Sequence, residues 1–173
     1  MIDQLCSMSA NQRSLDQGSY LFHQGDPVRT VFVVMQGSIE LTRHQRDGTS
    51  IVLQRAGYQM VLAEASVYAS AYHCDAVVAL PSRVLELKRS IFLRSLREDA
   101  EFGALWAQHL ALEVQSARYR SELLSRRTVS ERLDGWLAWQ GVGLPCKGQW
   151  KSVALQIGVS PEALYRELAK RRQ

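Results

Sequence analysis

The chain changes its hydrophobic period once, near Ser90, and this change limits the folds that it can adopt. Between residues 18 and 89, short apolar runs with period-two alternation are separated by turn signals. From Ser90 to about Arg127, apolar residues instead recur every three or four positions, with no proline and one glycine, Gly103. Period two is typical of strands and period 3.6 of helices. The sequence therefore predicts an α+β chain, with an antiparallel β-domain followed by helices.

The β-domain is predicted to contain many short strands. Val31, Val33 and Met35 alternate with their neighbours as in a strand with one or both faces buried. Short antiparallel strands in such number form a sandwich or a barrel. Because glycine and aspartate tolerate positive φ, the turns are predicted at Gly25-Asp26, Gln36-Gly37 and Asp47-Gly48.

The helical segment from Ser90 to about Arg127 is much longer than the usual globular helix of about eleven or twelve residues. We expect a break between Asp99 and Gly103. A helix of this length usually lies along a second body, so we predict that it pairs two subunits; in the alternative, its apolar stripe packs only on its own β-domain. Trp106, His109 and Leu110, in the middle of the helix, are expected to face a ligand pocket as well as the other subunit.

A further helix is predicted to begin after Thr128. The stretch Thr128-Val-Ser-Glu131 has a threonine at the N-cap and a glutamate three residues later, which is the pattern of a capping box. The break between Arg127 and Thr128 is predicted to be a hinge.

The segment from 150 to 173, WKSVALQIGVSPEALYRELAKRRQ, is the most specific stretch of the chain. Val153, Ala154 and Ile157 predict a short helix, which Gly158 ends through a left-handed turn. Ser160 then caps a second helix whose first position is Pro161. This is the pattern of a helix-turn-helix. Two packed helices without a DNA partner are the plainer alternative.

The helix-turn-helix geometry assigns roles to the side chains of this segment. Glu162 is expected to accept from a cytosine amino group, and Arg166, one turn later, to donate to guanine. Lys151, Lys170, Arg171 and Arg172 suit contacts with phosphates, whereas Leu155, Ala163, Leu164 and Leu168 are expected to hold the two helices together. The predicted DNA-binding residues are Lys151, Ser160, Glu162, Ala163, Arg166 and Lys170.

Composition supports this assignment and excludes other classes. From Arg118 onward the chain has eleven Lys and Arg against five Asp and Glu, which favours a polyanionic partner. No run of eighteen apolar residues and no apolar leader segment occurs, so we expect a cytoplasmic protein without membrane contact. The three cysteines are far apart and reduced thiols are expected. No catalytic arrangement, P-loop or metal-spaced cluster is recognisable, so no enzyme and no metal site are predicted.

The chain resembles the CRP/FNR superfamily of bacterial transcription regulators over nearly its full length. Four stretches show the resemblance: HQGDPVRTVFVVMQGSIEL (23–41), AEASVY (63–68), SERLDGWLAW (130–139) and IGVSPEALYRELAK (157–170). The resemblance implies a cyclic-nucleotide-binding-type jelly-roll over 1–98, a dimerisation helix over 99–127 and a DNA-binding domain over 128–173. It also implies a homodimer on a near-palindromic operator, with RNA polymerase as a further partner. Members of the family usually continue past the reading helix into wing strands, whereas this sequence stops at Gln173, so a truncated or absent wing is expected.

The stretch 63–68 resembles the phosphate cassette of the family, with changes. Ala63 replaces the glycine that precedes Glu64, and the usual Arg-Ser pair falls on His73 and Cys74. A buried phosphate without an arginine is poorly compensated. We therefore predict an effector other than cyclic AMP or cyclic GMP, or a vestigial cassette. The predicted effector-pocket residues are Glu64, Ala65, His73, Cys74, Trp106 and His109.

The sequence thus predicts a sequence-specific DNA-binding regulator controlled by a signal at the β-domain. One alternative is an interaction or scaffold protein that keeps this fold but has lost specific DNA binding, motivated by the missing wing and by Pro161, which stands where the family often has arginine. Another is a haem or redox sensor that uses His73 or Cys74, although adjacent strand residues point to opposite faces. Apart from this haem, no cofactor is predicted.

Overall fold

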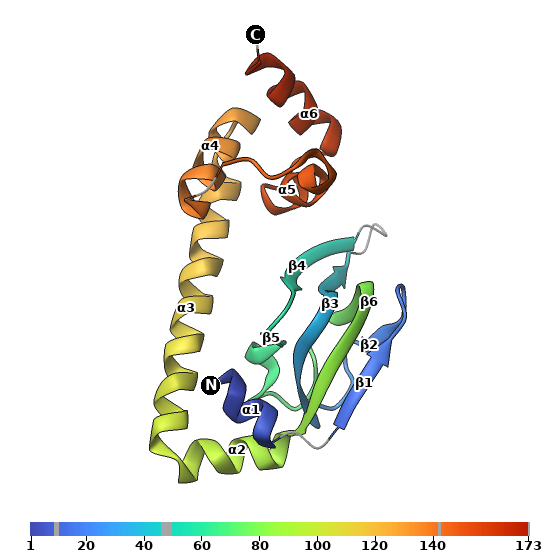
Figure 1. The fold of residues 1–173 in the computed structure, drawn as a ribbon, viewed down its shortest axis with the longest axis vertical. Helices are drawn as coiled ribbons and strands as arrows, with labels where there is room; N and C mark the ends of the chain where they lie inside the picture. Colours follow the sequence, from blue (N-terminus) through green and yellow to red (C-terminus); the bar gives the residue numbers. More distant parts are fainter. Residues whose placement is uncertain (9–10, 46–49, 142, 173) are drawn as a thin grey trace. The chain divides into compact units, whose positions relative to one another are not determined.

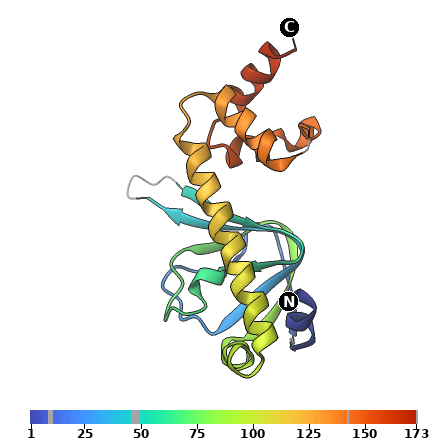
Figure 2. The ribbon, with the colours of Figure 1, turned by 90° about the vertical axis from the view of Figure 1, so that its left-hand side faces the viewer.

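The chain forms two compact units, residues 1–108 and residues 109–173, in a computed structural model that describes residues 1–8, 11–45, 50–141 and 143–172. The first unit holds the β-domain, and the second holds the C-terminal helices (Figure 1). The division falls inside the long helix α3 (Ala100–Ser125), which is continuous in Figure 2.

The first unit is an antiparallel jelly-roll built on six strands, which confirms the predicted fold class. The strands are β1 (Asn11–Leu15), β2 (Tyr20–Phe22), β3 (Thr30–His44), β4 (Ser50–Ala56), β5 (Met60–Leu62) and β6 (Asp75–Lys88). The order in the sheet is β1-β6-β3-β4, with β2 also paired to β6 and β5 to β3. The long strands β3 and β6 therefore carry the rest of the roll.

Alternating apolar residues of β3 and β6 fill the roll. Val34, Ile39, Ala76 and Val84 have no exposed surface, and they pack in one cluster with Phe22 and other apolar residues. Burial of these side chains supplies the main stabilising free energy of the unit, at about 1.5–3 kcal/mol for each large side chain.

One predicted turn is wrong and one is confirmed. Gln36-Gly37 does not end a strand, because β3 continues from Thr30 to His44 and its register on β6 shifts around this point, as in a β-bulge. Gly37 has a φ of 85°, and a Cβ there would lie 2.3 Å from the Pro81 carbonyl oxygen, so glycine permits the close approach of two strands. Gly25-Asp26 does turn the chain between β2 and β3. The predicted turn at Asp47-Gly48 lies outside the described residues.

Two helices continue the first unit, and a third, which the sequence analysis did not predict, precedes the strands. α1 spans Ile2–Met8, and α2 (Arg89–Glu98) follows β6 directly. Asp99 separates α2 from α3, and its carboxylate accepts from the Phe102 amide at 2.9 Å. This confirms the predicted break. α3 is fixed to the unit by buried Phe102 and Trp106, and the Trp106 indole donates to the Tyr68 hydroxyl at 3.1 Å.

The second unit packs the end of α3 with three further helices: α4 (Val129–Gln140), α5 (Trp150–Gln156) and α6 (Pro161–Lys170), with a 3₁₀ turn at Lys147–Gln149. The capping box of α4 is confirmed, because the Thr128 hydroxyl accepts from the Glu131 amide and the Glu131 carboxylate accepts from the Thr128 amide. No helix within the described ranges is both long and apolar enough to cross a bilayer.

The backbone of the β5 region offers a stability test. Gln59 is exposed and has a φ of 60°, in the left-handed region, while its amide donates to the Val34 carbonyl at 2.7 Å. A side chain in this region costs about 1–2 kcal/mol, more than the extra chain entropy of glycine. We expect Gln59→Gly to raise the free energy of unfolding by about 0.5–1 kcal/mol in urea denaturation. The control Tyr58→Gly, at an exposed neighbour without positive φ, should lower it.

Candidate functional site

The two helices α5 and α6 meet at a tight turn that favours glycine. Gly158 has a φ of 65°, and a Cβ there would lie 2.4 Å from Cδ2 of Leu124. The hydroxyl of Ser160 then accepts from the Ala163 amide at 3.2 Å, and Pro161 occupies the first turn of α6. These features confirm the predicted helix-turn-helix, including its glycine turn and its serine cap.

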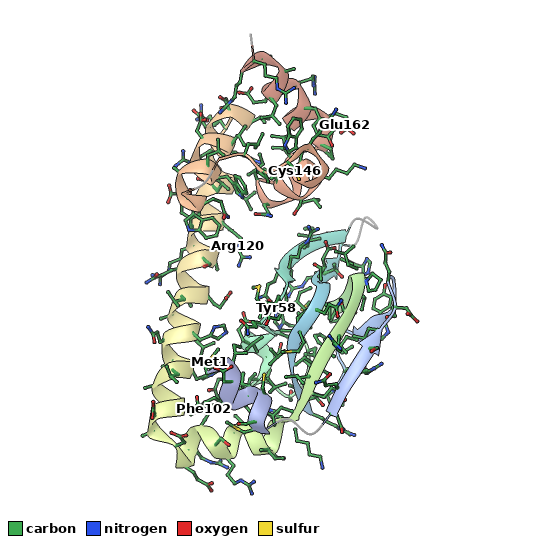
Figure 3. All side chains as sticks on the ribbon, viewed as in Figure 1. Met1, Tyr58, Phe102, Arg120, Cys146 and Glu162 are labelled. Atoms are coloured by element: carbon green, nitrogen blue, oxygen red, sulfur yellow. The ribbon has the colours of Figure 1, made fainter. Side chains whose placement is uncertain are left out.

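The faces of α6 separate packing residues from surface residues. Leu164 and Leu168 are buried in the core of the second unit. Glu162 and Arg166 are exposed, four positions apart and therefore on one face of the helix. Figure 3 shows Glu162 at the start of α6. The two side chains predicted to read bases thus lie free of the core.

Glu162 is held in its charged form. Hydrogen bonds from its own amide and from Ser160 lower the pKa of its carboxyl, with smaller contributions from the charges of Arg166 and Lys151. An ionised carboxylate only accepts hydrogen bonds, which suits it to a base amino group. Lys151 of α5 and Arg166 of α6 thus both favour the ionised form of the Glu162 carboxyl.

The other residues predicted at this surface divide into two groups. Lys151, Ser160 and Lys170 are exposed, and Ala163 is half-buried. Arg171 differs from the prediction, because its guanidinium is bound to the Asp134 and Glu167 carboxylates, and these hydrogen bonds raise its pKa.

A second difference is Leu155, which was expected to hold the helices together but is 54% exposed. The packing is made instead by Val153, Ala154 and Ile157 on the other side of α5.

The sequence analysis missed Arg132, which connects the end of α3 to the turn of the helix-turn-helix. Its Nη1 donates to the Gly158 carbonyl at 2.9 Å, and its Nε and Nη2 donate to the carbonyls of Arg126 and Leu124 at 2.9 and 2.8 Å. These carbonyls are left without helical partners where helices end. The residue pattern does not indicate these contacts, because their acceptors are backbone carbonyls, which any residue type supplies.

The junction at Arg127 and Thr128 lies within one packed body. Tyr119 and Leu123 of α3 belong to the same core as Leu133 of α4, and the Tyr119 hydroxyl donates to the Gly135 carbonyl. A rotation of α4–α6 about this junction would break these contacts and those of Arg132. The packing therefore does not support the predicted hinge at this point.

The stretch that resembles the phosphate cassette begins with a residue in the left-handed conformation. Ala63 has a φ of 56°, the left-handed conformation that favours the glycine it replaces. Glu64 follows in a 3₁₀ turn (Glu64–Ser66), and its carboxylate accepts from Gln54 Nε2 at 3.3 Å. Ala65 is exposed. The backbone of this stretch thus has a conformation in which glycine is favoured, while Glu64 contacts a side chain of the protein itself.

His73 and Cys74 have opposite environments, as predicted, although both lie just before β6 begins and not within it. His73 is exposed, and its Nδ1 lies 2.8 Å from the Ser66 hydroxyl. Cys74 has no exposed surface, and burial raises the pKa of its thiol. A buried neutral thiol is a poor nucleophile and a poor metal ligand. The described residues hold no group of three or more His, Cys, Asp or Glu that could bind a metal ion.

Two further predicted pocket residues lie on α3. Trp106 is 2% exposed and packs edge-to-face on Phe92, with ring centroids 4.8 Å apart, so it anchors α3 to the first unit. His109 is half-buried. Neither the hollow lined by Arg29 and Arg89 nor the hollow lined by Arg166 and Lys170 is lined by any of the predicted pocket residues.

Arg43 is the residue of the cassette region that the sequence analysis missed. It comes from β3, and its Nη2 donates to the His73 carbonyl at 3.0 Å. Its charge also acts on the Cys74 thiol. The buried Thr42 hydroxyl next to it and Nε of Arg43 have no hydrogen-bond partner among the described residues. The pairing of Thr42 with Asp75 places Arg43 here, and this register was not available from the sequence pattern.

The contacts of Arg132 allow a stability test of the second unit. Arg132→Ala should lower the free energy of unfolding by about 2 kcal/mol, since hydrogen bonds to a charged group contribute about 1.5–3 kcal/mol. Arg132→Lys should not restore it, because an ammonium cannot reach three separate acceptors. The measurement is urea denaturation followed by tryptophan fluorescence. Arg127→Ala, at an exposed neighbouring arginine, serves as the control and should change stability by less than about 0.5 kcal/mol; equal losses in both variants would contradict the role of Arg132.

Comparisons with known proteins place this geometry in a family. The sequence model of the cyclic nucleotide-binding domain family matches residues 12–99, about half of the chain. A search of curated protein sequences found no match. Among solved structures, FixK2 from Bradyrhizobium japonicum is 18% identical with a TM-score of 0.75, over 93% of this chain and 83% of its own.

Two further solved structures show the same fold. CLP, described as a c-di-GMP responsive global regulator of Xanthomonas campestris, is 18% identical with a TM-score of 0.71, over 99% of this chain and 90% of its own. The catabolite activator protein of Thermus thermophilus is 23% identical with a TM-score of 0.52, over 98% of this chain and 81% of its own. These structures share the fold that the resemblance implies, and the chain belongs to the cyclic nucleotide-binding domain family.

Proposed function

We propose that the protein is a sequence-specific DNA-binding transcription regulator that acts as a homodimer in the cytoplasm. The observation that carries the proposal is the exposure of Glu162 and Arg166 on one face of α6, in a helix-turn-helix whose other face is buried. In this motif the start of the second helix enters the major groove. The regulator fold supports the same conclusion.

The surface of α6 provides both kinds of contact that specific binding needs. Arg166 suits bidentate donation to guanine, and the ionised Glu162 suits acceptance from cytosine. Lys151 and Lys170 are exposed cations that suit phosphate oxygens. Base contacts then select the sequence, and phosphate contacts position the protein.

A homodimer is proposed because apolar side chains form an exposed seam along α3. Ala107, Leu110, Val114 and Ala117 recur with the three- and four-residue spacing of a coiled coil, and Leu124 continues the seam seven residues later, after a polar position at Ser121. Val114 is 48% exposed and Leu124 is 47% exposed. Pairing of two copies through this seam would present two reading helices, as a near-palindromic operator requires. RNA polymerase is proposed as a further partner, as for other regulators of this type.

The signal at the β-roll is proposed to be an effector other than cyclic AMP or cyclic GMP. Glu64 contacts Gln54, and Ala63 replaces the glycine of the cassette. Arg43 provides a cation nearby, so another anionic effector is compatible with the site. Redox sensing by Cys74 has less support, because burial raises the pKa of its thiol. Haem ligation through Nε2 of His73 is compatible with the Ser66 contact at Nδ1 and stays an alternative.

The DNA-reading role of Arg166 is tested by comparing substitutions at one arginine, Arg166, and one lysine, Lys151, of the helix-turn-helix. Arg166→Ala should cost about 1–3 kcal/mol on the preferred site and relax base preference, because it removes a base contact. Lys151→Ala should weaken binding to all sequences similarly, because it removes a phosphate contact. Electrophoretic shift titrations on a selected site and on random-sequence competitor, at two salt concentrations, measure both.

The two variants serve as controls for each other, since each removes one exposed cation of the helix-turn-helix, Arg166 on α6 and Lys151 on α5. Uniform weakening by both variants would show that Arg166 does not read bases. A wild-type protein without preference for any selected site would favour the interaction-protein alternative over the regulator.

The proposed seam is tested by a charge on α3. Val114→Glu places two like charges opposite each other in the paired helices, so we expect the molecular mass in solution to fall from dimer to monomer. The matched control is Gln115→Glu, the same change at the exposed next residue, which lies off the seam. Light scattering after size exclusion measures the mass. A monomeric wild type at micromolar concentration would contradict the proposal.

The effector proposal predicts that cyclic AMP and cyclic GMP give no saturable heat of binding in calorimetric titration of the full chain. The reason is the methyl group of Ala63 where backbone amides must approach a phosphate. Ala63→Gly tests this reason, because it removes the methyl while keeping the left-handed conformation. Tight binding of either nucleotide by the wild type would overturn the proposal.

A further inference from the structure

The first unit contains a cavity that none of the functions above uses. It has a volume of about 440 Å³ and is lined by six residues of the β2–β3 connection and of α2: Val28, Arg29, Arg89, Ser90, Leu93 and Arg97. In Figure 1, α2 follows directly from the end of β6, at one end of the roll. The phosphate cassette and its neighbours do not contribute to this lining.

The cavity has a strong positive charge. Three of its six lining residues are arginines, and no lining residue is acidic. Among the described residues, neither Arg29, Arg89 nor Arg97 forms an ion pair with a carboxylate. By contrast, Arg94 on the same helix pairs with Glu98 at 4.0 Å. Three guanidinium groups without acidic partners repel one another, so an anion between them would be stabilised.

The backbone fixes part of this arrangement. The amide of Arg89 donates to the Arg29 carbonyl at 2.9 Å, and Nε of Arg89 donates to the Val67 carbonyl at 2.6 Å. The connection that carries Arg29 and the start of α2 are therefore held together. The cavity thus brings together its arginines without requiring a change in the backbone.

The start of α2 adds to the positive potential. α2 is ten residues long, and its N-cap, Lys88, provides no side-chain hydrogen bond to the first turn. Amides at a helix N-terminus favour anions, and oxyanions in particular. Ser90, in this first turn, lines the cavity and adds a hydroxyl donor.

The volume of this open cavity is sufficient for an organic ligand and not only for a bare ion. Its volume falls within the range of about 300–1,000 Å³ that is usual for small-molecule sites. Val28 and Leu93 provide apolar surface beside the arginines. Guanidinium forks match the oxygens of a phosphate group in pairs. A ligand with a phosphate at one end and an apolar group at the other would use both surfaces.

We propose that this cavity, lined by Arg29, Arg89 and Arg97, binds a small organic phosphate at a site separate from the cassette of the β-roll. The phosphate contacts the guanidinium groups and the first turn of α2, and the organic group packs on Val28 and Leu93. The site lies within residues 1–108, whereas the DNA-reading residues lie within 109–173. The proposal therefore stands or fails independently of DNA binding.

The test is calorimetric titration of the full chain with phenyl phosphate at low salt, where electrostatic contacts are least screened. We expect saturable binding of one molecule per chain. Arg97→Ala and Arg29→Ala should each raise the Kd at least about tenfold, since each removes a charge-assisted contact. Both side chains are exposed, so neither change should unfold the protein, which circular dichroism checks.

The matched control is Arg94→Ala, which removes an arginine of α2 that pairs with Glu98 and does not line the cavity. It should change the Kd by less than about twofold, because exposed ion pairs contribute little. Phenol in place of phenyl phosphate should not bind. Absence of saturable binding, an equal loss in Arg94→Ala, or binding of tetraglutamate in preference to phenyl phosphate would each overturn the proposal; the last would indicate a surface for acidic peptides.

Discussion

The burial of Leu123 at the end of α3 among Leu133 and Trp136 of α4 is the contact on which the candidate DNA surface depends. It joins the last turns of a long helix to the helix-turn-helix and leaves Glu162 and Arg166 outside the core. Arg132 reinforces this junction by donating to carbonyls on both sides of it. Movement of α3 should therefore be transmitted directly to the reading helix, and not be lost at a flexible joint after Arg127.

In the β-roll, the stretch that resembles the phosphate cassette begins with a left-handed residue, and its Glu64 contacts a side chain of the protein itself. Ala63 holds the left-handed conformation at which glycine is most favourable, while the following residues form contacts within the protein itself. Arg43 adds a cation from a neighbouring strand. The strands β3 and β6 maintain this geometry because their buried apolar residues form the core of the roll.

Local signals in the sequence were sufficient for features that depend on neighbouring residues. The capping box at Thr128, the left-handed turn at Gly158 and the cap at Ser160 were all predicted correctly. Features that depend on distant residues were not. Gly37 resembles a turn glycine but serves the close approach to Pro81, and the roles of Arg43 and Arg132 depend on carbonyl groups supplied by other elements. Leu155 shows the same limit, because an apolar residue on a short helix can face either side.

The central claim is that two copies of α6 read one near-palindromic DNA site. The most direct measurement is selection of binding sites from a random DNA pool by the full chain, followed by footprinting of the enriched sequences. The account predicts a two-fold symmetric site with half-sites about one helical turn, roughly 10 base pairs, apart. Enrichment of isolated half-sites, or of no sequence at all, would contradict it.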